Sequence, residues 1–158
     1  MPPLSIFIIA RDEADRIGRT IAAVAGLSDD IVVVDSGSTD GTQAIAEALG
    51  ARVIFNAWPG YGEQKRFAED QCRHDWLLNL DADEVVPPDL RAEIEALFAK
   101  GEPGADAYKM RIAEIFPGEK APHRFAYALP PVRLYRRDKG RYSPSPVHDR
   151  VDLVSDAR

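Results

Sequence analysis

The chain has 158 residues, with 20 Lys and Arg against 26 Asp and Glu and a net charge of -6 at pH 7. This length suits one domain with a hydrophobic core. A composition of 45% hydrophobic and 29% charged residues is typical of a globular protein rather than a disordered one. The negative charge argues against a nucleic acid as the main partner.

The first 100 residues alternate between short apolar runs and helical patterns. Runs rich in β-branched residues predict strands at 4–9, 30–35, 52–55 and 76–80. Apolar spacing and terminal Gly or Pro residues predict helices at 12–27, 38–50, 62–72 and 87–101. Because strands that are apolar on both faces and alternate with helices form parallel sheets, the pattern predicts an α/β fold. Its mostly parallel central sheet would carry helices on both faces.

Residues 101–158 follow a different pattern. Two further strands are predicted at 107–116 and 132–138, and the prolines between them predict a loop at 117–131. No shift in composition marks a domain boundary. We therefore expect a single domain, 1–158, with an irregular second half built onto the parallel first half, 1–100.

A group of acids follows the fourth predicted strand in the stretch "WLLNLDADEVV". In extended backbone, residues i and i+2 face the same side, so Asp81 and Asp83 can project together. Ligands bind at the carboxyl ends of strands in open α/β sheets, and carboxylate pairs suit Mg²⁺ or Mn²⁺. The pattern therefore favours a metal site. The alternative is that these acids cap the next helix or form a solvated turn.

A second acidic stretch, "VVVDSGSTDGT", follows the second predicted strand. Asp35 would face the same crevice and could accept hydrogen bonds from a base or a ribose. Gly37 and Gly41 allow close approach of a ligand or a positive φ. The alternative is a plain strand–turn–helix connection with Asp40 as a helix cap. We favour the ligand for Asp35 and the cap for Asp40.

Four stretches in this order resemble family 2 glycosyltransferases of the GT-A fold, a Rossmann-like fold. They are "IIARDEADRIGRTI", "VVVDSGSTDGT", "WPGYGEQKRFA" and "LNLDADE". The likeness is greatest to bacterial lipopolysaccharide-core glycosyltransferases, and the later "RLYRRDKGRYSPSPVHDRV" is similar to that subgroup too. The resemblance implies an inverting, metal-dependent hexosyl transfer from a nucleotide sugar, most often a UDP-sugar, to a glycan or glycolipid acceptor. It also implies a role in lipopolysaccharide or cell-envelope polysaccharide synthesis.

The resemblance further implies roles for individual residues. Asp83 is similar to the metal ligand, Asp81 to a ribose or metal contact, and Asp35, with Ser36 beside it, to a nucleoside contact. The first strand would end against the base through the donor-binding residues Ala10, Arg11 and Glu13. Many members carry an acid at the place of Ser36 and an Asn at the place of Asp12, so these two positions leave the base of the donor open.

The resemblance also implies a division of the chain and its boundaries. Residues 1–100 would be the nucleotide-binding half and residues 101–158 the acceptor-side half. Family chains usually run further, so we expect a chain truncated at its C-terminus or a short natural form.

An acid–base group is needed to take the proton of the acceptor hydroxyl. Asp149 in "PVHDRV" is the candidate catalytic base, and His148 could bind the metal or the diphosphate. The alternatives are a salt bridge from Asp149 to Arg150 and a surface position for His148.

Basic and aromatic residues add further candidates. Lys65 follows a glycine-rich turn that opens a predicted helix, where backbone N–H groups favour phosphate; the alternative is a solvated helix face. A basic strip could meet diphosphate, a phosphorylated acceptor or anionic lipid, although for most of its members we favour plain exposed positions on an edge strand. The strip consists of Arg133, Arg136, Arg137, Lys139 and Arg141. Trp58, Tyr61 and Tyr142 could stack on sugar rings or serve packing.

The expected compartment follows from what the sequence lacks. A single cysteine, Cys72, leaves no disulfide framework within the chain. The apolar run "LSIFIIA" is too short to cross a bilayer, and no basic residue precedes it as in a signal peptide. We therefore expect a cytoplasmic protein, with peripheral contact to the inner face of the membrane if the basic strip meets lipid.

Two other functions fit parts of the sequence. A strand that ends in Asp81-x-Asp83 also resembles a haloacid-dehalogenase-type phosphatase with Asp81 as nucleophile, although that motif normally opens its fold. A catalytically incomplete nucleotide-sugar-binding module is the non-enzymatic alternative.

Overall fold

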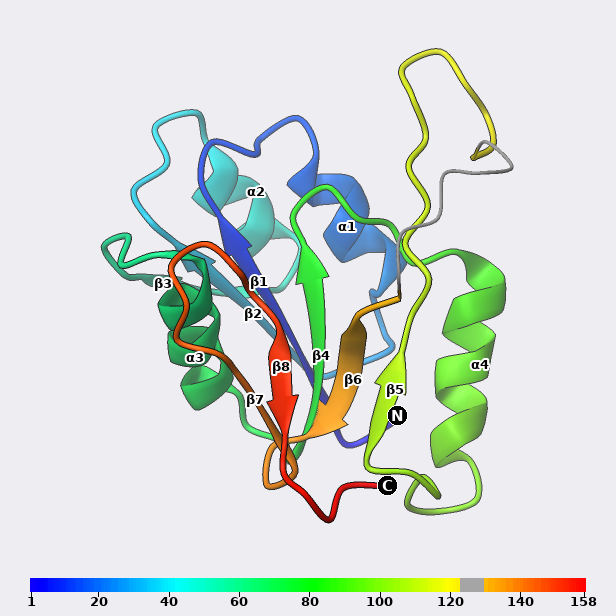
Figure 1. Cartoon of the computed structure of the whole chain (residues 1–158). Coiled ribbons are helices and arrows are strands. Elements are labelled where there is room, and N and C mark those ends of the chain that lie inside the picture. The colour runs from blue at the N-terminus through cyan, green and yellow to red at the C-terminus, as the bar shows by residue number, and fades with distance from the viewer. Residues whose placement is uncertain (123–129) are drawn as a thin grey trace.

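The computed structural model describes residues 1–122 and 130–158, and its main feature is a six-stranded sheet with the order β3-β2-β1-β4-β6-β5 (Figure 1). Those strands are β1 (Leu4–Ala10), β2 (Asp30–Asp35), β3 (Arg52–Phe55), β4 (Trp76–Asp81), β5 (Ala107–Lys109) and β6 (Val132–Arg136). The helices are α1 (Ile17–Ala23), α2 (Thr42–Ala48), α3 (Tyr61–Gln71) and α4 (Pro88–Phe98). A separate antiparallel hairpin joins β7 (Gly140–Tyr142) to β8 (Val151–Leu153).

The first four strands run parallel, and β4, β6 and β5 pair antiparallel. This confirms the predicted α/β class with a mostly parallel sheet. Because the chain crosses from β1 outward to β3 and then returns to β4 on the other side of β1, the strand order reverses between β1 and β4. Such a reversal opens a crevice at the carboxyl ends of the two strands.

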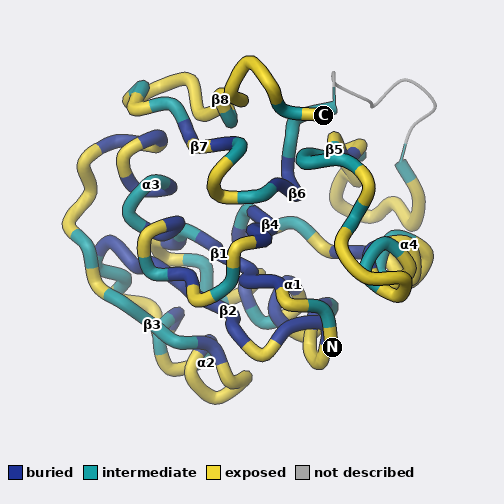
Figure 2. The backbone as a smooth tube through the Cα atoms, turned by 90° about the horizontal axis from the view of Figure 1, so that it is seen from below, coloured by how far each residue is buried: buried dark blue, intermediate teal, exposed yellow. Residues whose placement is uncertain are grey.

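Helices cover both faces of the sheet, as the apolar strands predict. Successive residues of a strand point to opposite faces, and β1 shows this directly. Ile6 and Ile8 belong to a core that includes side chains of α1, α2 and α4, whereas Phe7 packs with side chains of α3 and of the β7–β8 hairpin. Figure 2 shows β1, β2 and β4 largely buried in the interior, with many exposed positions on α2 and α4 and in the loops.

The structure differs from the predicted elements in several places. The first helix covers Ile17–Ala23 rather than 12–27, because residues 12–14 bind to the next loop instead. The strand predicted at 107–116 ends at Lys109, where the β5–β6 register shifts. The β7–β8 hairpin was not predicted. Of the loop predicted at 117–131, residues 123–129 lie outside the described residues.

Candidate active site

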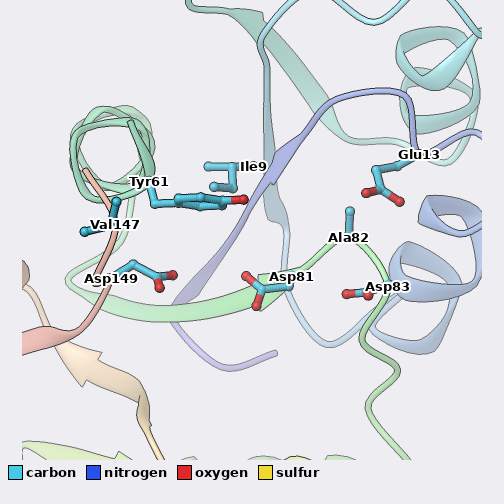
Figure 3. A pocket seen from close by; sticks show the side chains of 8 residues that line it. All are labelled: Ile9, Glu13, Tyr61, Asp81, Ala82, Asp83, Val147 and Asp149. Carbon is cyan, nitrogen blue, oxygen red and sulfur yellow. The ribbon is translucent and has the colours of Figure 1, made fainter. Parts of the chain in front are cut away.

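A pocket of about 310 Å³ lies at the carboxyl ends of β1 and β4 (Figure 3). It is lined by Ile9, Glu13, Tyr61, Asp81, Ala82, Asp83, Val147 and Asp149. The four carboxylates come from the β1–α1 loop, the end of β4, and the segment before β8, so residues that are far apart in the sequence meet here. The structure therefore places Glu13, Asp81, Asp83 and Asp149 around one pocket, while the predicted site residues Asp35 and His148 do not line it.

Asp81 is held between two cations. Its Oδ1 accepts a hydrogen bond from Lys65 Nζ at 3.0 Å, and its Oδ2 accepts one from Arg133 Nη2 at 3.0 Å. Arg133 Nη2 also donates to Glu84 Oε1 at 2.8 Å, while the backbone N–H of Asp81 donates to Glu84 Oε2 at 2.9 Å. Burial alone would raise the pKa of Asp81, but the charges and hydrogen bonds of Lys65 and Arg133 outweigh it and lower the pKa to about 2. Asp81 is thus a carboxylate whose charge is already balanced by the protein.

Lys65 lies inside the molecule, with 1% of its side chain exposed. Its ammonium donates to Asp149 Oδ2 as well as to Asp81, and it lies 5.0 Å from the ring centroid of Tyr142. Burial would lower the pKa of Lys65, but Tyr142, Asp81 and Asp149 together raise it. The solvated helix face considered for Lys65 is therefore wrong. The salt bridge considered between Asp149 and Arg150 is also wrong, since Arg150 pairs with Asp152 instead.

The N-terminus of α3 binds protein rather than a free anion. The N–H groups of Tyr61 and Gly62 donate to the carbonyls of Pro146 and Ser145 at 3.2 and 3.0 Å. A Cβ on Gly62 would lie 2.0 Å from the carbonyl oxygen of Ser143, so only glycine permits this approach. These two donors are not available to a phosphate, which corrects the reason given for Lys65. They instead hold the segment that carries Asp149.

A buried amide connects the two sides of the site. The Oδ1 of Asn79, in β4, accepts hydrogen bonds from Arg133 Nη1 at 2.5 Å and from Tyr142 Oη at 2.6 Å. Arg133 binds Asp81, and the Tyr142 ring lies beside Lys65. Asn79 was not among the predicted site residues, although a polar residue within the apolar run "WLLNL" is a signal that a buried network passes through this strand.

Asp35 has a structural task of its own. Its Oδ1 accepts hydrogen bonds at 2.8 Å from the N–H groups of Gly37 and Ser38 and from the side-chain amide of Gln43, and its Oδ2 accepts one from Ser38 Oγ at 2.5 Å. The carboxylate is buried and does not line the pocket. It shapes the β2–α2 loop, and its role as a nucleoside contact stays a prediction.

The β1–α1 and β2–α2 loops are joined by reciprocal hydrogen bonds. The N–H of Asp12 donates to Ser38 Oγ at 2.8 Å, and the N–H of Thr39 donates to Asp12 Oδ1 at 2.8 Å. Asp40 accepts the N–H groups of Ala14 and Thr42, both at 3.0 Å, so it orders the start of α2 while Gly41 is the N-cap residue itself. This arrangement holds the β1–α1 loop, and Glu13 within it, beside the pocket.

The predicted donor-binding residues of the first strand differ in their surroundings. Glu13 lines the pocket, and its Oε2 lies 2.7 Å from Arg16 Nη2. Its pKa is raised, because burial and the charge of Asp83 outweigh the lowering effect of Arg16. Ala10 is buried and accepts the N–H of Ser36 at 3.1 Å. The hydroxyl of Ser36 is buried and has no hydrogen-bond partner among the described residues. Arg11 is exposed beside Asp12.

The predicted metal site of Asp81, Asp83 and His148 is not assembled as one cluster. His148 is exposed and does not line the pocket, and both oxygens of Asp81 are taken by Lys65 and Arg133. Within 1–122 and 130–158, no three His, Cys, Asp or Glu side chains are placed to hold a metal ion. Asp83 and Glu13 remain as carboxylates facing the pocket. Such a set fits Mg²⁺ or Mn²⁺, which is commonly bound by one or two carboxylates together with substrate phosphates.

The basic strip has a different role from the one considered for anions. Arg133 is buried against Asp81 and Glu84, and the other four members pair with carboxylates or carbonyls. Those contacts are Arg136 with Asp138, Arg137 with the carbonyls of Cys72 and His74, Lys139 with Asp156, and Arg141 with Asp70. Arg133, Arg137 and Arg141 therefore bind residues of the first half, whereas Arg136 and Lys139 pair with acids of the second half. Among the described residues, no helix is both long and apolar enough to cross a membrane.

The profile described as Glycosyl transferase family 2 matches residues 5–152. The chain belongs to this family. It is 42% identical over 160 residues to an uncharacterized glycosyltransferase of Rickettsia felis, covering 99% of this chain and 56% of the relative. It is 35% identical over 163 residues to the lipopolysaccharide core biosynthesis glycosyltransferase LpsC of Rhizobium meliloti, covering 94% of this chain and 57% of the relative. The chain thus spans about half the length of these curated relatives.

Solved structures show the same GT-A fold, which confirms the predicted fold class. Glucosyl-3-phosphoglycerate synthase from Mycobacterium tuberculosis, in complex with Mn²⁺, uridine diphosphate and glucosyl-3-phosphoglycerate, is 29% identical with a TM-score of 0.56. The alignment covers 68% of this chain and 43% of that one. S. aureus TarS in complex with UDP-GlcNAc is 20% identical with a TM-score of 0.61, covering 76% and 37% of the two chains, and supports the fold alone. Family membership argues against the phosphatase alternative, because the match to the glycosyltransferase family covers residues 5–152 and so includes Asp81.

Proposed function

We propose that this chain carries the donor site and the catalytic base of an inverting glycosyltransferase. The enzyme transfers a hexose from a nucleotide sugar to a glycan or glycolipid acceptor. The observation that supports this most strongly is the meeting of Asp83, Asp81 and Asp149 in one pocket at the carboxyl ends of β1 and β4. In this proposal residues 1–100 bind the nucleotide and residues 101–158 form the acceptor side.

Asp83 and Glu13 are the residues that would hold Mg²⁺ or Mn²⁺. A divalent cation stabilises the negative charge of a departing diphosphate as a Lewis acid. His148 is the residue before Asp149, but its side chain is exposed and does not line the pocket. Asp83, which lines the pocket, is therefore the first metal ligand to test. Lys65 and Arg133 keep Asp81 ionised beside that site.

Asp149 is the proposed general base. Its carboxylate takes the proton of the acceptor hydroxyl while the hydroxyl oxygen forms a bond to the anomeric carbon of the donor. The bond from that carbon to the diphosphate oxygen breaks, and its electron pair leaves with the nucleoside diphosphate. Because attack and departure occur on opposite faces of the sugar, a single displacement inverts the anomeric centre. Lys65 holds Asp149 in the pocket for this role.

The donor and the acceptor are inferred from relatives. The M. tuberculosis synthase binds uridine diphosphate with Mn²⁺, which supports a UDP-sugar as the donor and Mn²⁺ as one possible ion. The R. meliloti relative acts in lipopolysaccharide core biosynthesis, which supports a lipopolysaccharide or envelope glycan as the acceptor. A cytoplasmic place beside the inner face of the membrane would suit such an acceptor.

The decisive experiment measures donor binding and transfer in the same preparations. Thermal shift and calorimetry with UDP-hexoses should show binding that Mn²⁺ or Mg²⁺ strengthens, because a ligand that binds the folded state raises the apparent stability. Asp83→Ala should lose the part of the affinity that depends on the metal and keep its fold. If this variant binds the donor with unchanged, metal-dependent affinity, Asp83 is not a metal ligand.

The binding-module alternative gives a different result in the same assay. A module would bind the nucleotide sugar with metal, yet it would release no nucleoside diphosphate when lipopolysaccharide core oligosaccharide is added. Transfer by this chain would exclude the module. Donor binding without transfer would favour it.

A further inference from the structure

Two large aromatic side chains stay exposed beside the pocket. Trp58 is 45% exposed and Tyr61 is 50% exposed. Their ring centroids lie 4.8 Å apart and their planes are at 89°, an edge-to-face arrangement that favours a fixed pair. Aromatic residues of this size usually bury most of their surface. Tyr61 lines the pocket, and Trp58 packs against it from outside the lining, so the pair offers an exposed aromatic surface to a ligand in the pocket.

The backbone that carries this pair is fixed on the segment that carries Asp149. The N–H of Tyr61 donates to the carbonyl of Pro146 at 3.2 Å, and a Cβ on Gly60 would lie 3.0 Å from Pro146. Any ligand that lies on Tyr61 is thus presented to Asp149 in a defined position. Preorganised sites of this kind bind at a smaller cost in ordering.

The pocket has two chemically different walls. Tyr61, Val147 and Asp149 line one side, whereas Glu13 and Asp83 line the other (Figure 3). The first wall combines an aromatic ring and an exposed aliphatic side chain with one carboxylate. The second wall is acidic and is the side proposed to take the metal and the diphosphate.

We infer that Tyr61, supported by Trp58, binds a sugar ring of the acceptor. A pyranose presents C–H groups on one face and hydroxyls at its rim, which an aromatic ring and a carboxylate can contact together. Small-molecule sites commonly combine aromatic surface with a few polar groups in this way. This inference rests on the proposed function, since the hydroxyl that gives its proton to Asp149 must belong to a ring on the same wall.

Other occupants fit the wall less well. The predicted nucleoside contacts Asp35 and Ser36 do not line this pocket. An anionic lipid surface would meet the four carboxylates at the pocket, which repel it. The sugar ring is the ligand whose chemistry matches both the aromatic surface and Asp149.

Tryptophan fluorescence tests the inference directly. The chain has two tryptophans, of which Trp76 is 3% exposed in the core, so quenching by acrylamide reports on Trp58. The probes are methyl glycosides of glucose, galactose, mannose and N-acetylglucosamine at millimolar concentration, with and without UDP and Mn²⁺. We expect at least one glycoside to protect the quenchable emission, and Trp58→Phe to remove that signal. Calorimetry measures UDP affinity in the same samples.

Two variants complete the test. Tyr61→Ala should raise at least tenfold the glycoside concentration that gives half-maximal protection of Trp58 from acrylamide. It should leave the Kd of UDP within a few-fold. Phe55→Ala removes another exposed aromatic, 67% exposed at the end of β3 and absent from the pocket lining, and should leave both measurements unchanged. The inference is overturned if UDP alone protects Trp58 and Tyr61→Ala weakens UDP binding tenfold, because the wall then belongs to the nucleotide.

The remaining outcomes separate the sugar subsite from the proposed function. If UDP binds with Mn²⁺ but no glycoside protects Trp58, the sugar subsite is wrong while the proposed function stands. If a glycoside protects Trp58 and neither UDP nor a UDP-sugar binds, the sugar site is supported and the proposed donor site is wrong.

Discussion

The two halves of the chain contribute to the pocket in different ways. In residues 1–100, consecutive β–α units bring strand ends to one edge of the sheet, so Asp81 and Asp83 reach the crevice through the local chain order. In residues 101–158, short strands joined by irregular segments bring Arg133 and Asp149 to the same place through long-range contacts. The first half thus collects negative charge, and the second half supplies both a cation that offsets it and a further acid.

Because each half supplies some of these residues, the site lies at the boundary between the two halves. Asp81 lies between Lys65 of the first half and Arg133 of the second, and Lys65 also binds Asp149 of the second half. A buried charge that loses its counter-charge is costly. We therefore expect changes at this boundary to affect transfer more than changes away from it. Three variants test this on transfer and a fourth tests stability at the boundary, from the largest expected effect to the smallest.

Asp149→Asn removes the proposed base and keeps the size of the side chain. A base acts on the acceptor in the transition state, so the Kd of the donor should stay within a few-fold while transfer falls by roughly 10²–10⁴. Calorimetry with the UDP-sugar and a transfer assay measure the two quantities. Asp152→Asn, an exposed acid three residues later, is the matched control and should change neither. Transfer within a few-fold of the original would assign the base to another residue.

Gly62→Ala separates α3 from the segment that carries Asp149. The new Cβ would meet the carbonyl oxygen of Ser143 at 2.0 Å and that of Ser145 at 2.6 Å, so the two segments must move apart. Overpacking of this kind typically costs about 1–3 kcal/mol of stability, and a misplacement of about 1 Å at a site can cost roughly 10²-fold in rate. Urea unfolding and the transfer assay measure both.

The control for that variant is Gly104→Ala. A Cβ at Gly104 meets nothing within 4 Å, and this glycine does not have a positive φ. Stability and transfer should both stay near the original values. A Gly62→Ala protein that transfers as well as the Gly104→Ala protein would show that the contact between α3 and Ser143 does not position Asp149.

Elements formed by local patterns could be predicted from the sequence, whereas contacts across this boundary could not. Strand runs, helix spacing and the acids at strand ends follow from local patterns, and they predicted the parallel sheet together with Asp81 and Asp83. The partners of Lys65 lie 16 and 84 residues away, and no local pattern reports such a distance. Lys65 was therefore weighed as a phosphate ligand or a solvated residue, when it is a buried counter-charge.

The role of Arg133 was missed for a related reason. Within "RLYRRDKGR" its spacing looks like one member of an exposed basic strip, whereas β6 places it against Asn79 and Asp81 in β4. The antiparallel pairing of β6 with β4 fixes that neighbour, and because α4 and β5 lie between these strands in the chain, no local pattern reports the pairing. The β7–β8 hairpin was equally unpredictable, because its three-residue strands are too short to show a period.

Tyr142→Phe is a smaller change that tests the hydrogen bond between Tyr142 and Asn79. It removes the hydroxyl that donates to Asn79 Oδ1 at 2.6 Å and keeps the ring beside Lys65. The loss of one hydrogen bond costs about 0.5–1.5 kcal/mol, so we expect transfer to fall by roughly two- to tenfold if the bond positions the site. Tyr135→Phe removes a buried hydroxyl that binds Glu69 instead. Tyr135→Phe should lose a similar free energy of unfolding in urea and leave the transfer rate unchanged. If both variants lose transfer equally, the hydrogen bond from Tyr142 to Asn79 does not position the site.

The smallest expected effect concerns Glu69, a buried acid between the halves and away from the pocket. Its Oε1 accepts hydrogen bonds from Tyr135 Oη and, at 3.0 Å, from the N–H of Tyr142, while its Oε2 has no hydrogen-bond partner among the described residues. Burial raises the pKa of Glu69 although Tyr135, Tyr142 and Arg141 lower it. A carboxyl with a raised folded-state pKa contributes stability that is fully present below the unfolded pKa and is lost as the pH rises through the folded value.

Glu69→Gln should therefore remove this pH dependence. The amide keeps an oxygen for Tyr135 and Tyr142, and it loses only the ion pair with the half-exposed Arg141, whose Nε lies 3.7 Å from Oε2 and which contributes little. We expect the variant to equal the original protein in free energy of unfolding near pH 4 and to exceed it at pH 7, where the original has lost the contribution of its protonated carboxyl. Urea unfolding at the two pH values measures this. A variant that is less stable at pH 7 but not at pH 4 would show that the ionised carboxylate joins the halves, and the boundary would then depend on charge beyond the pocket itself.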